Sequence, residues 1–274
     1  MKIVDAHIHL SNIEVLKQGA LQNPGIEYSL EGLIAEFDEA GIEMGIGMGL
    51  TEVAPDTFPC SAAINPMTLD MVNTFPERLK YCPGFNPHSG RLDELEKALS
   101  DPVVVGVKIY AGYYHFHLMD PVHQPVYELA AHYGKPVVIH TGDTHSARGL
   151  LKYSHPLAVD ELAVTHRNIN FIIAHVGYPW LTDAAAVVYK NENVFADVSG
   201  LIVGEKDLAR YQYEELFVHQ IRTALVYTDF EKYLFGTDWP LIRIKPYLAF
   251  VKRLFPERSY ADLFYGNASR VFNI

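Results

Sequence analysis

Six side chains that can bind a metal ion follow short apolar runs of the sequence. They are His7 and His9, Lys108, His140, His175 and Asp238. Because side chains alternate across a β-strand, His7 and His9 would point the same way, with Cα atoms roughly 6.5 Å apart. Two imidazoles at that spacing can share one ion, at Zn–N distances of about 2.0 to 2.1 Å. A His-x-His pair alone is a weak signal, but joined to the other side chains it predicts a site for a divalent metal, with zinc as the expected ion.

The elements that must bring these residues together alternate regularly between strands and helices. Apolar, β-branched runs predict eight strands, over residues 2–7, 45–48, 79–85, 103–109, 136–140, 170–175, 194–198 and 233–238. Such alternation implies a parallel sheet, and runs such as Val103-Val104-Val105 suit strands that are buried on both faces. In a barrel of eight such strands, all carboxyl ends meet at one rim, where active sites lie. We therefore predict an α/β fold, a (β/α)8 TIM barrel that spans residues 1–274 as a single domain.

The predicted helices lie between these strands. They cover residues 30–40, 65–73, 92–99, 122–133, 156–163, 181–190 and 206–226, followed by a tail over 247–272 that is helical in pieces. Ser29 and Gly41 are typical N-cap and C-terminal residues for the first of them. An open doubly wound sheet is the alternative fold. It would be expected to carry a glycine-rich phosphate turn after its first strand, and none follows His9.

Composition narrows the class of protein. The chain has 274 residues, of which 49% are apolar and 20% charged, as in an ordinary globular protein. A formal charge of -11 without a clustered Lys/Arg face argues against nucleic acid as a partner. The sequence shows no apolar run of about 18 residues and no signal peptide, so we expect no membrane partner and a cytoplasmic location. Cys60 and Cys82 form no Cys-x-x-Cys motif and are expected to be reduced thiols.

Several segments around the candidate ligands resemble those of one enzyme superfamily. They are Asp5-Ala6-His7-Ile8-His9, Ile139-His140-Thr141-Gly142, Ala174-His175-Val176-Gly177, Phe235-Gly236-Thr237-Asp238-Trp239-Pro240 and Gly266-Asn267-Ala268 with Arg270 and Phe272. In this order they are similar to the amidohydrolase superfamily, in particular to its branch of small metal-dependent hydrolases and decarboxylases of the aminocarboxymuconate-semialdehyde decarboxylase type. The resemblance spans the chain and implies the same barrel. These motifs do not specify a substrate.

The resemblance implies a role for each candidate ligand. His7 and His9 would be metal ligands on the first strand, and His140 would be the ligand on the fifth strand. Asp238 would bind the metal and accept a proton from its water. His175 would either bind a second metal ion or polarise the substrate beside a single one.

Two further residues bear on the metal. Lys108 lies where some superfamily members carry a carboxylated lysine that bridges two ions, whereas other members of this branch use one ion and no bridging lysine. An unmodified Lys108 could instead bind a substrate carboxylate as a point charge. The sequence therefore leaves open whether the site holds one ion or two. Asp197 ends the seventh predicted strand and is a candidate for orienting a ligand histidine.

Residues near the predicted rim are candidates for contact with a small-molecule substrate. Tyr110 follows the fourth strand, and His145 and Arg148 follow the fifth, so all three are expected on the same rim. His115 and His117 form a second His-x-His pattern in the loop after the fourth strand. We interpret that pair as loop decoration rather than as metal ligands.

The preferred hypothesis for function is hydrolysis of a small amide, ester or lactone. The divalent ion would activate water and polarise a carbonyl, Asp238 would pass a proton to the leaving group, and His175 would stabilise the developing oxyanion. The alternative is nonoxidative decarboxylation of a small unsaturated or aromatic acid at the same site. A catalytically silent metal-binding or scaffold protein is a third hypothesis, disfavoured because no candidate ligand is missing. The oligomeric state, including a homo-oligomer, stays open.

Overall fold

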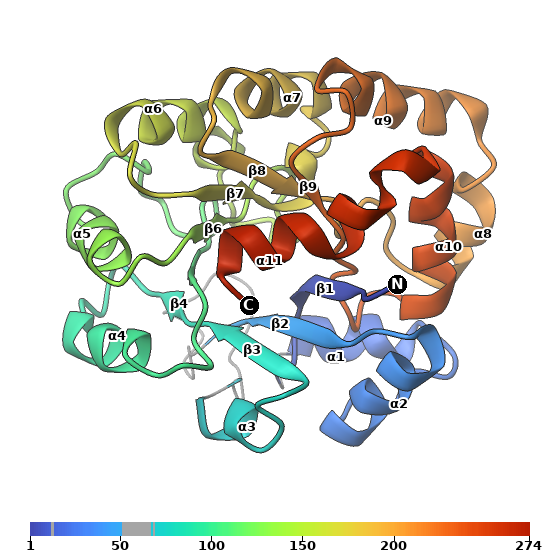
Figure 1. Cartoon of the computed structure of the whole chain (residues 1–274), viewed down its shortest axis with the longest axis horizontal. Coiled ribbons are helices and arrows are strands. Elements are labelled where there is room, and N and C mark those ends of the chain that lie inside the picture. The colour runs from blue at the N-terminus through green and yellow to red at the C-terminus, as the bar shows by residue number, and fades with distance from the viewer. Residues whose placement is uncertain (12–13, 51–66, 68) are drawn as a thin grey trace.

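The computed structural model describes residues 1–11, 14–50, 67 and 69–274, and nine parallel strands lie at the centre of that part of the chain (Figure 1). Hydrogen bonds order them as β1-β2-β3 and as β4-β5-β6-β7-β8-β9. Their bounds are β1 Val4–Ile8, β2 Met44–Met48, β3 Leu79–Cys82, β4 Gly84–Phe85, β5 Val107–Ile109, β6 Val137–Ile139, β7 Phe171–Ile173, β8 Val194–Asp197 and β9 Tyr233–Leu234.

Backbone hydrogen bonds outside the named strands join the two sets of strands into one ring. On one side, Val105 N donates to Tyr81 O of β3 at 2.9 Å, and on the other Ala6 N donates to Phe235 O at 2.8 Å. Pro83 separates β3 from β4 because proline has no N–H to give to the strand ladder. The predicted eight-stranded TIM barrel is therefore confirmed, with its third strand in two pieces.

Helices pack around the outside of the barrel. The first predicted helix is confirmed residue for residue as α2, because Gly32 N donates to the Ser29 side chain at its start and Gly41 (φ 74°) ends it. The helix bounds are α1 Glu14–Leu21, α2 Leu30–Ala40, α3 Leu69–Asn73, α4 Leu92–Leu99, α5 Gln124–His132, α6 Leu157–Thr165, α7 Leu181–Lys190, α8 Glu205–Tyr211, α9 Glu215–Tyr227, α10 Ile244–Leu254 and α11 Asn267–Phe272.

The prediction of one long helix over residues 206–226 is wrong, because the chain breaks there into α8 and α9. Glu214 has extended backbone torsions (φ -72°, ψ 109°) that no helix can contain. Phe217, just beyond the break, packs against Tyr211 and Phe250, at ring-centroid distances of 5.8 Å and 6.4 Å. These tertiary contacts decide the local geometry in place of helix propensity.

Two other element predictions need correction. The strand predicted over residues 103–109 is regular only as β5, because the Asp101 side chain accepts a hydrogen bond from Val103 N at 3.0 Å and turns the chain there. The short helix α1 was not predicted. Of the helix predicted over residues 65–73, α3 is observed, while 65, 66 and 68 lie outside the described residues.

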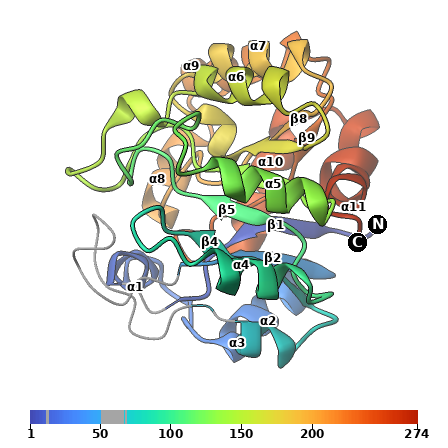
Figure 2. The same ribbon diagram turned by 90° about the vertical axis from the view of Figure 1, so that its left-hand side faces the viewer.

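Buried side chains form two layers that alternate along the strands. Val138 and Ile172 belong to a compact inner cluster, whereas the neighbouring Val137 and Ile139 belong to the larger cluster beneath the helices. Phe272 of α11 joins the inner cluster. Accordingly, α11 lies across the end of the barrel that carries both termini, and α1 and α8 lie at the opposite end (Figures 1 and 2). The apolar inner layer thus lies toward the α11 end of the barrel, and the end near α1 is left for polar side chains.

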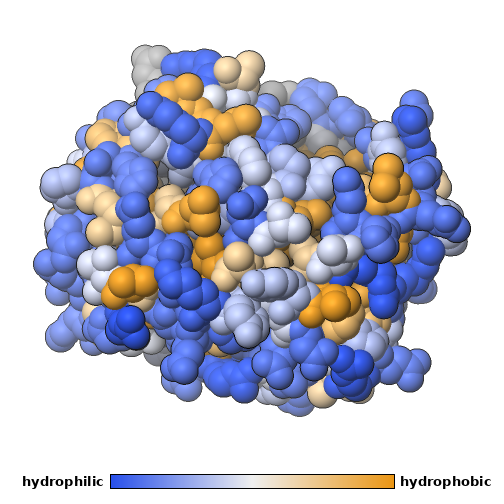
Figure 3. Space-filling model, turned by 90° about the horizontal axis from the view of Figure 1, so that it is seen from above, coloured by the Kyte–Doolittle hydropathy of each residue, from blue (hydrophilic) through white to orange (hydrophobic). Residues whose placement is uncertain are grey.

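On the face that Figure 3 shows, apolar side chains lie in small groups among polar ones. Within the described ranges, no helix combines the length and apolarity needed to cross a membrane. Cys82 is a buried, free thiol, and Cys60 lies outside the described residues.

Candidate metal centre

The polar residues at the ends of the strands point to the inside of the barrel. His140 follows inner-layer Val138 by two residues, and Asp197 follows inner-layer Phe195 by two, so each pair points to the same side of its strand. Lys108 is fully buried on β5. The polar residues therefore continue the inner layer at the carboxyl ends of the strands, where barrel enzymes place their active sites.

Three of the predicted ligands come together closely enough to hold one cation. The ligand atoms of His7, His175 and Asp238 all lie within 4.8 Å of one another. The Nε2 atom of His7 is buried, has no hydrogen-bond partner among the described residues and lies 3.6 Å from Asp238 Oδ1. His9 Nε2 lies 3.1 Å from the same oxygen. An unpartnered imidazole nitrogen beside a buried carboxylate suits a bound divalent ion, so the residues present fit a metal.

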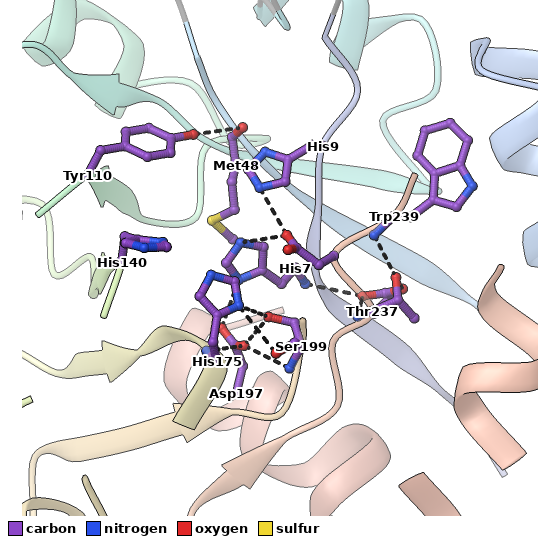
Figure 4. Close-up of polar contacts among 12 residues, drawn as sticks. His7, His9, Met48, Tyr110, His140, His175, Asp197, Ser199, Thr237 and Trp239 are labelled. Atoms are coloured by element: carbon purple, nitrogen blue, oxygen red, sulfur yellow. Dashed lines mark hydrogen bonds and ion pairs between the residues drawn. The ribbon is translucent and has the colours of Figure 1, made fainter. Parts of the chain in front are cut away.

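Asp197 orients two of these histidines (Figure 4). Its Oδ2 lies 2.9 Å from His7 Nδ1, which places the ring proton on Nδ1 and leaves the Nε2 lone pair free. Its Oδ1 accepts hydrogen bonds from His175 N at 3.1 Å and from the Ser199 hydroxyl. The Ser199 hydroxyl oxygen lies 2.9 Å from His175 Nδ1, and the Ser199 carbonyl oxygen lies 3.2 Å from the same nitrogen. Since a carbonyl only accepts, His175 also carries its proton on Nδ1.

Left-handed backbone torsions let the ligands turn inward directly after their strands. His175 (φ 59°) and Val176 (φ 48°) follow β7 in this conformation, and Asp238 has φ 69°. Such torsions are uncommon for residues other than glycine, and for a β-branched valine they are strained. Strain of this kind persists only where surrounding contacts fix it, and it is typical of functional sites.

Electrostatics favour the protonation states that metal binding requires. Burial, reinforced by Lys108, lowers the pKa of His7 to about 3, although Asp197 opposes the shift. Burial also lowers the pKa of His175. Burial alone would raise the pKa of Asp238, but the neighbouring His175, His9 and His7 outweigh it and hold that pKa below its usual value. Neutral imidazoles and an ionised carboxylate are the forms that bind a cation.

Lys108 places a buried amine in the site. Its Nζ is buried, makes no hydrogen bond with any described residue and lies 5.3 Å from the centre of the Tyr110 ring. Burial lowers the pKa of Lys108 to about 8, while Asp197 and Asp238 act in the opposite direction. The Tyr110 hydroxyl donates to Gly49 O at 2.9 Å. Tyr110 is thus a buried wall beside the amine.

His140 lies beside the cluster of three but is not part of it. Its ring centroid is 5.0 Å from that of His175 and 4.9 Å from that of Tyr113. Its Nε2 lies 2.9 Å from the carbonyl of Asp143, so Nε2 carries the proton and Nδ1 is left as the free nitrogen. His140 can therefore approach an ion only through Nδ1.

The predicted substrate contacts after the fifth strand lie on exposed loops. His145 and Arg148 are both exposed, and His145 N donates to the Tyr113 hydroxyl at 2.9 Å. His115 Nε2 lies 2.8 Å from the Arg148 carbonyl. In the same loop as His115, Met119 N donates to His117 Nδ1 at 3.2 Å, so the second His-x-His pair makes local loop contacts.

Three residues of the site were given no role from the sequence: Asp5, Ser199 and Thr237. Ser199 could have been found from its position two residues after Asp197, where the two side chains can share a side. Asp5 stands in the same relation to His7. No sequence signal marks the role of Thr237, because its contacts depend on the path of the chain around Asp238.

Comparison with known proteins identifies the family of the chain. The amidohydrolase family profile matches residues 4–274. The chain therefore belongs to the amidohydrolase family. None of the curated proteins matches the chain.

Three solved structures illustrate the fold. An uncharacterised TIM-barrel protein from Bordetella bronchiseptica is 17% identical, with a TM-score of 0.73 and coverage of 100% of this chain and 99% of that one. A probable 2-pyrone-4,6-dicarboxylic acid hydrolase from Acinetobacter baumannii is 16% identical, with a TM-score of 0.67 and the same coverage. A 5-carboxyvanillate decarboxylase from Novosphingobium aromaticivorans, complexed with manganese, is 12% identical, with a TM-score of 0.66 and coverage of 99% and 96%.

Proposed function

We propose that this protein is a metal-dependent hydrolase of a small amide, ester or lactone. The observation that supports it best is the convergence of His7, His175 and Asp238 within 4.8 Å, with a buried imidazole nitrogen that has no hydrogen-bond partner in the described part of the chain. Three such groups leave room for water and substrate around a cation, which is the arrangement of catalytic metal sites.

The proposed ligands are His7, His9, His140, His175 and Asp238, and zinc is the proposed ion because imidazole and carboxylate suit it. When bound, the ion acts as a Lewis acid that makes water nucleophilic and polarises a carbonyl group. Whether a second ion binds depends on Lys108. Its buried amine would bridge two ions if carboxylated, and it would remain a cation in a site with one ion.

The chain's own groups divide the remaining work. Asp238 is ionised and lies at the centre of the cluster, so it can accept the proton of the attacking water and return it to the leaving group. The hydrogen bond from His175 Nδ1 to the Ser199 carbonyl leaves the other ring nitrogen without a proton. His175 is thereby better suited to bind the ion than to donate to an oxyanion. Lys108 is the nearby cation for a developing or resident negative charge.

Substrate contact is proposed for Tyr110, His145 and Arg148. Tyr110 lies beside the Lys108 amine, and the other two lie on exposed loops that follow the fifth predicted strand. The loops would close over a small substrate, whose identity they would determine.

Substitution of Asp238 by Asn tests the catalytic proposal. The Asp238→Asn variant should keep the fold and lose at least about 100-fold in kcat on any ester or lactone that the wild type hydrolyses, since general acid–base catalysis contributes roughly 100-fold to 10,000-fold. Hydrolysis is followed by acid release at constant pH, and folding by circular dichroism. Undiminished turnover by a folded variant would contradict the role of Asp238.

Nonoxidative decarboxylation is the second candidate. The specific observation in its favour is the buried Lys108 Nζ, which has no hydrogen-bond partner within the ranges that the structure describes and could hold the carboxylate of an unsaturated or aromatic acid. A 5-carboxyvanillate decarboxylase complexed with manganese is among the structures with a similar fold, which supports this candidate. Assays that measure CO₂ release and ester or lactone cleavage on the same enzyme preparation separate the two activities.

A further inference from the structure

Asp5 is a fully buried carboxylate that contacts no candidate ligand side chain but holds the backbone around two of them. Its Oδ1 accepts hydrogen bonds from Thr237 N at 3.0 Å and from His7 N at 3.2 Å. Its Oδ2 accepts one from the Thr237 hydroxyl at 2.6 Å. A single carboxylate thus links the strand that carries His7 to the segment that carries Asp238.

Thr237 extends this contact to the far side of Asp238 (Figure 4). While its hydroxyl donates to Asp5, its oxygen accepts from Trp239 N at 3.1 Å. The residues before and after Asp238 are therefore both fixed by one threonine side chain. Asp238 itself has a left-handed backbone (φ 69°), which an aspartate adopts only where its surroundings fix it.

Backbone hydrogen bonds also join the chain around His7 directly to the segment that carries Asp238. Asp238 N donates to His7 O at 2.8 Å, and His9 N donates to Trp239 O at 2.7 Å. The β1–β2 register is irregular between Asp5 and Ile8, as at a β-bulge. The Asp5 carboxylate adds side-chain hydrogen bonds to these backbone bonds and so helps to fix where His7 faces Asp238.

We propose that Asp5 is a positioning residue that acts through Thr237 to hold the Asp238 carboxylate in the metal site. This inference rests on the proposed function, because it takes Asp238 to be a metal ligand. Without the threonine hydroxyl, Trp239 N loses its acceptor and Asp5 Oδ2 loses its donor. The turn at Asp238 can then relax, and the carboxylate no longer faces His7 and His9.

The test measures affinity for Zn²⁺ alone, by competition with a chromophoric chelator, in a set of matched variants. Thr237→Val keeps the shape of the side chain and removes the hydroxyl, and Thr237→Ser restores the hydroxyl. We expect Thr237→Val to bind zinc about 10- to 100-fold more weakly, and Thr237→Ser to remain within about threefold of the wild type. Asp5→Asn, which removes the acceptor of the Thr237 hydroxyl, should weaken binding in the same range.

Thr228→Val is the matched control for loss of a buried hydroxyl. Thr228 is buried and precedes β9, whereas Asp238 follows β9, and the Thr228 hydroxyl donates to Leu225 O at 3.0 Å and lies 3.1 Å from the Tyr233 hydroxyl. This variant should lower the melting temperature and leave zinc affinity unchanged. A merely structural role for Thr237 would instead make zinc affinity follow melting temperature in both variants.

The outcomes are distinguishable. Weaker zinc binding in Thr237→Val and Asp5→Asn, restored in Thr237→Ser and absent in Thr228→Val, supports the inference. Wild-type affinity in a folded Thr237→Val, or equal losses in Thr237→Val and Thr228→Val, would overturn it and leave the proposed function standing. If the wild type itself binds no zinc, the proposed function fails, and this inference fails with it.

Discussion

Two buried carboxylates, Asp197 and Asp5, lie on either side of His7 and support it in different ways. Asp197 contacts imidazole rings, directly at His7 and through Ser199 at His175, and it also accepts a hydrogen bond from His175 N. Asp5 contacts backbone N–H groups and one hydroxyl, and none of its hydrogen bonds reaches a ring. The first carboxylate therefore helps to decide which ring nitrogen is free, whereas the second acts on where the backbone places the ligands.

Their ionisation differs for the same reason. Burial would raise the pKa of Asp197, but His7, His175 and the Ser199 hydroxyl hold it below its usual value. Burial raises the pKa of Asp5 to about 7, and hydrogen bonds from Thr237 and His7 N only partly offset that rise. An imidazole can gain a proton and then attract a carboxylate as an opposite charge, whereas a hydroxyl or a backbone N–H carries no charge. The partners of a buried carboxylate thus indicate whether it acts on the rings of the metal ligands or only on the backbone.

The largest expected effect is that of Asp197→Asn. The substitution removes the acceptor that keeps the proton of His7 on Nδ1 and disturbs the Ser199 contact to His175, so two ligands lose their orientation together. We expect zinc affinity to fall by about 100-fold, the upper end for groups that orient ligands. Chelator competition measures it. A loss smaller than that of Thr237→Val would reverse the ranking of the two carboxylates.

Ser199→Ala should have a smaller effect because it disturbs only one ligand. The hydroxyl contact to His175 Nδ1 is lost, but the Ser199 carbonyl remains 3.2 Å from that nitrogen and His7 keeps Asp197. Zinc affinity should fall by about 10-fold. If Ser199→Ala equals Asp197→Asn in the same titration, Asp197 acts chiefly through Ser199, and the direct contact to His7 contributes little.

Glu36→Gln extends the comparison to a third buried carboxylate. Glu36 accepts from Trp239 Nε1 at 3.0 Å and from Ile244 N at 2.9 Å, and so supports the indole and the start of α10 rather than a ligand. The amide cannot accept both bonds, which should cost about 1–3 kcal/mol. Thermal unfolding should show a melting temperature roughly 2–4 °C lower per kcal/mol. A zinc affinity changed as strongly as in Asp5→Asn would show that this support reaches the metal site.

The smallest effect is expected for Tyr113→Phe, on the loop side of the site. The Tyr113 hydroxyl accepts from His145 N at 2.9 Å, and its ring packs on His140. Phenylalanine keeps the ring contact and loses the loop contact. We expect zinc affinity to stay within about threefold, because the group that orients His140 is the Asp143 carbonyl. A tenfold loss would place the loop among the elements that support the metal.

Much of the fold could be predicted because strands and helices leave periodic patterns. α2, α4 and α7 have the predicted bounds, since each combines an apolar face with clear ends. The break between α8 and α9 could not be predicted, because it depends on Phe217 packing against a distant helix. Local propensity has no access to such contacts.

The candidate site likewise has features that the sequence predicts and features that depend on distant contacts. The proximity of His7, His175 and Asp238 follows from the common rim of the strands. The role of Asp197 could be anticipated from its strand end, but Thr237 could not, because its contacts exist only with Asp238 in a left-handed turn. Nor could the Asp143 carbonyl at His140 be foreseen, since it depends on a loop conformation.

Zinc content tests the central claim most directly. The protein is incubated with Zn²⁺, dialysed and analysed for metal per chain, alongside His175→Ala and the exposed His132→Ala as a matched histidine control. The account predicts that the wild type and His132→Ala retain at least one ion per chain and that a folded His175→Ala loses it. Retention of the same zinc by His175→Ala, or none by the wild type, would contradict the assignment of this cluster as a metal site.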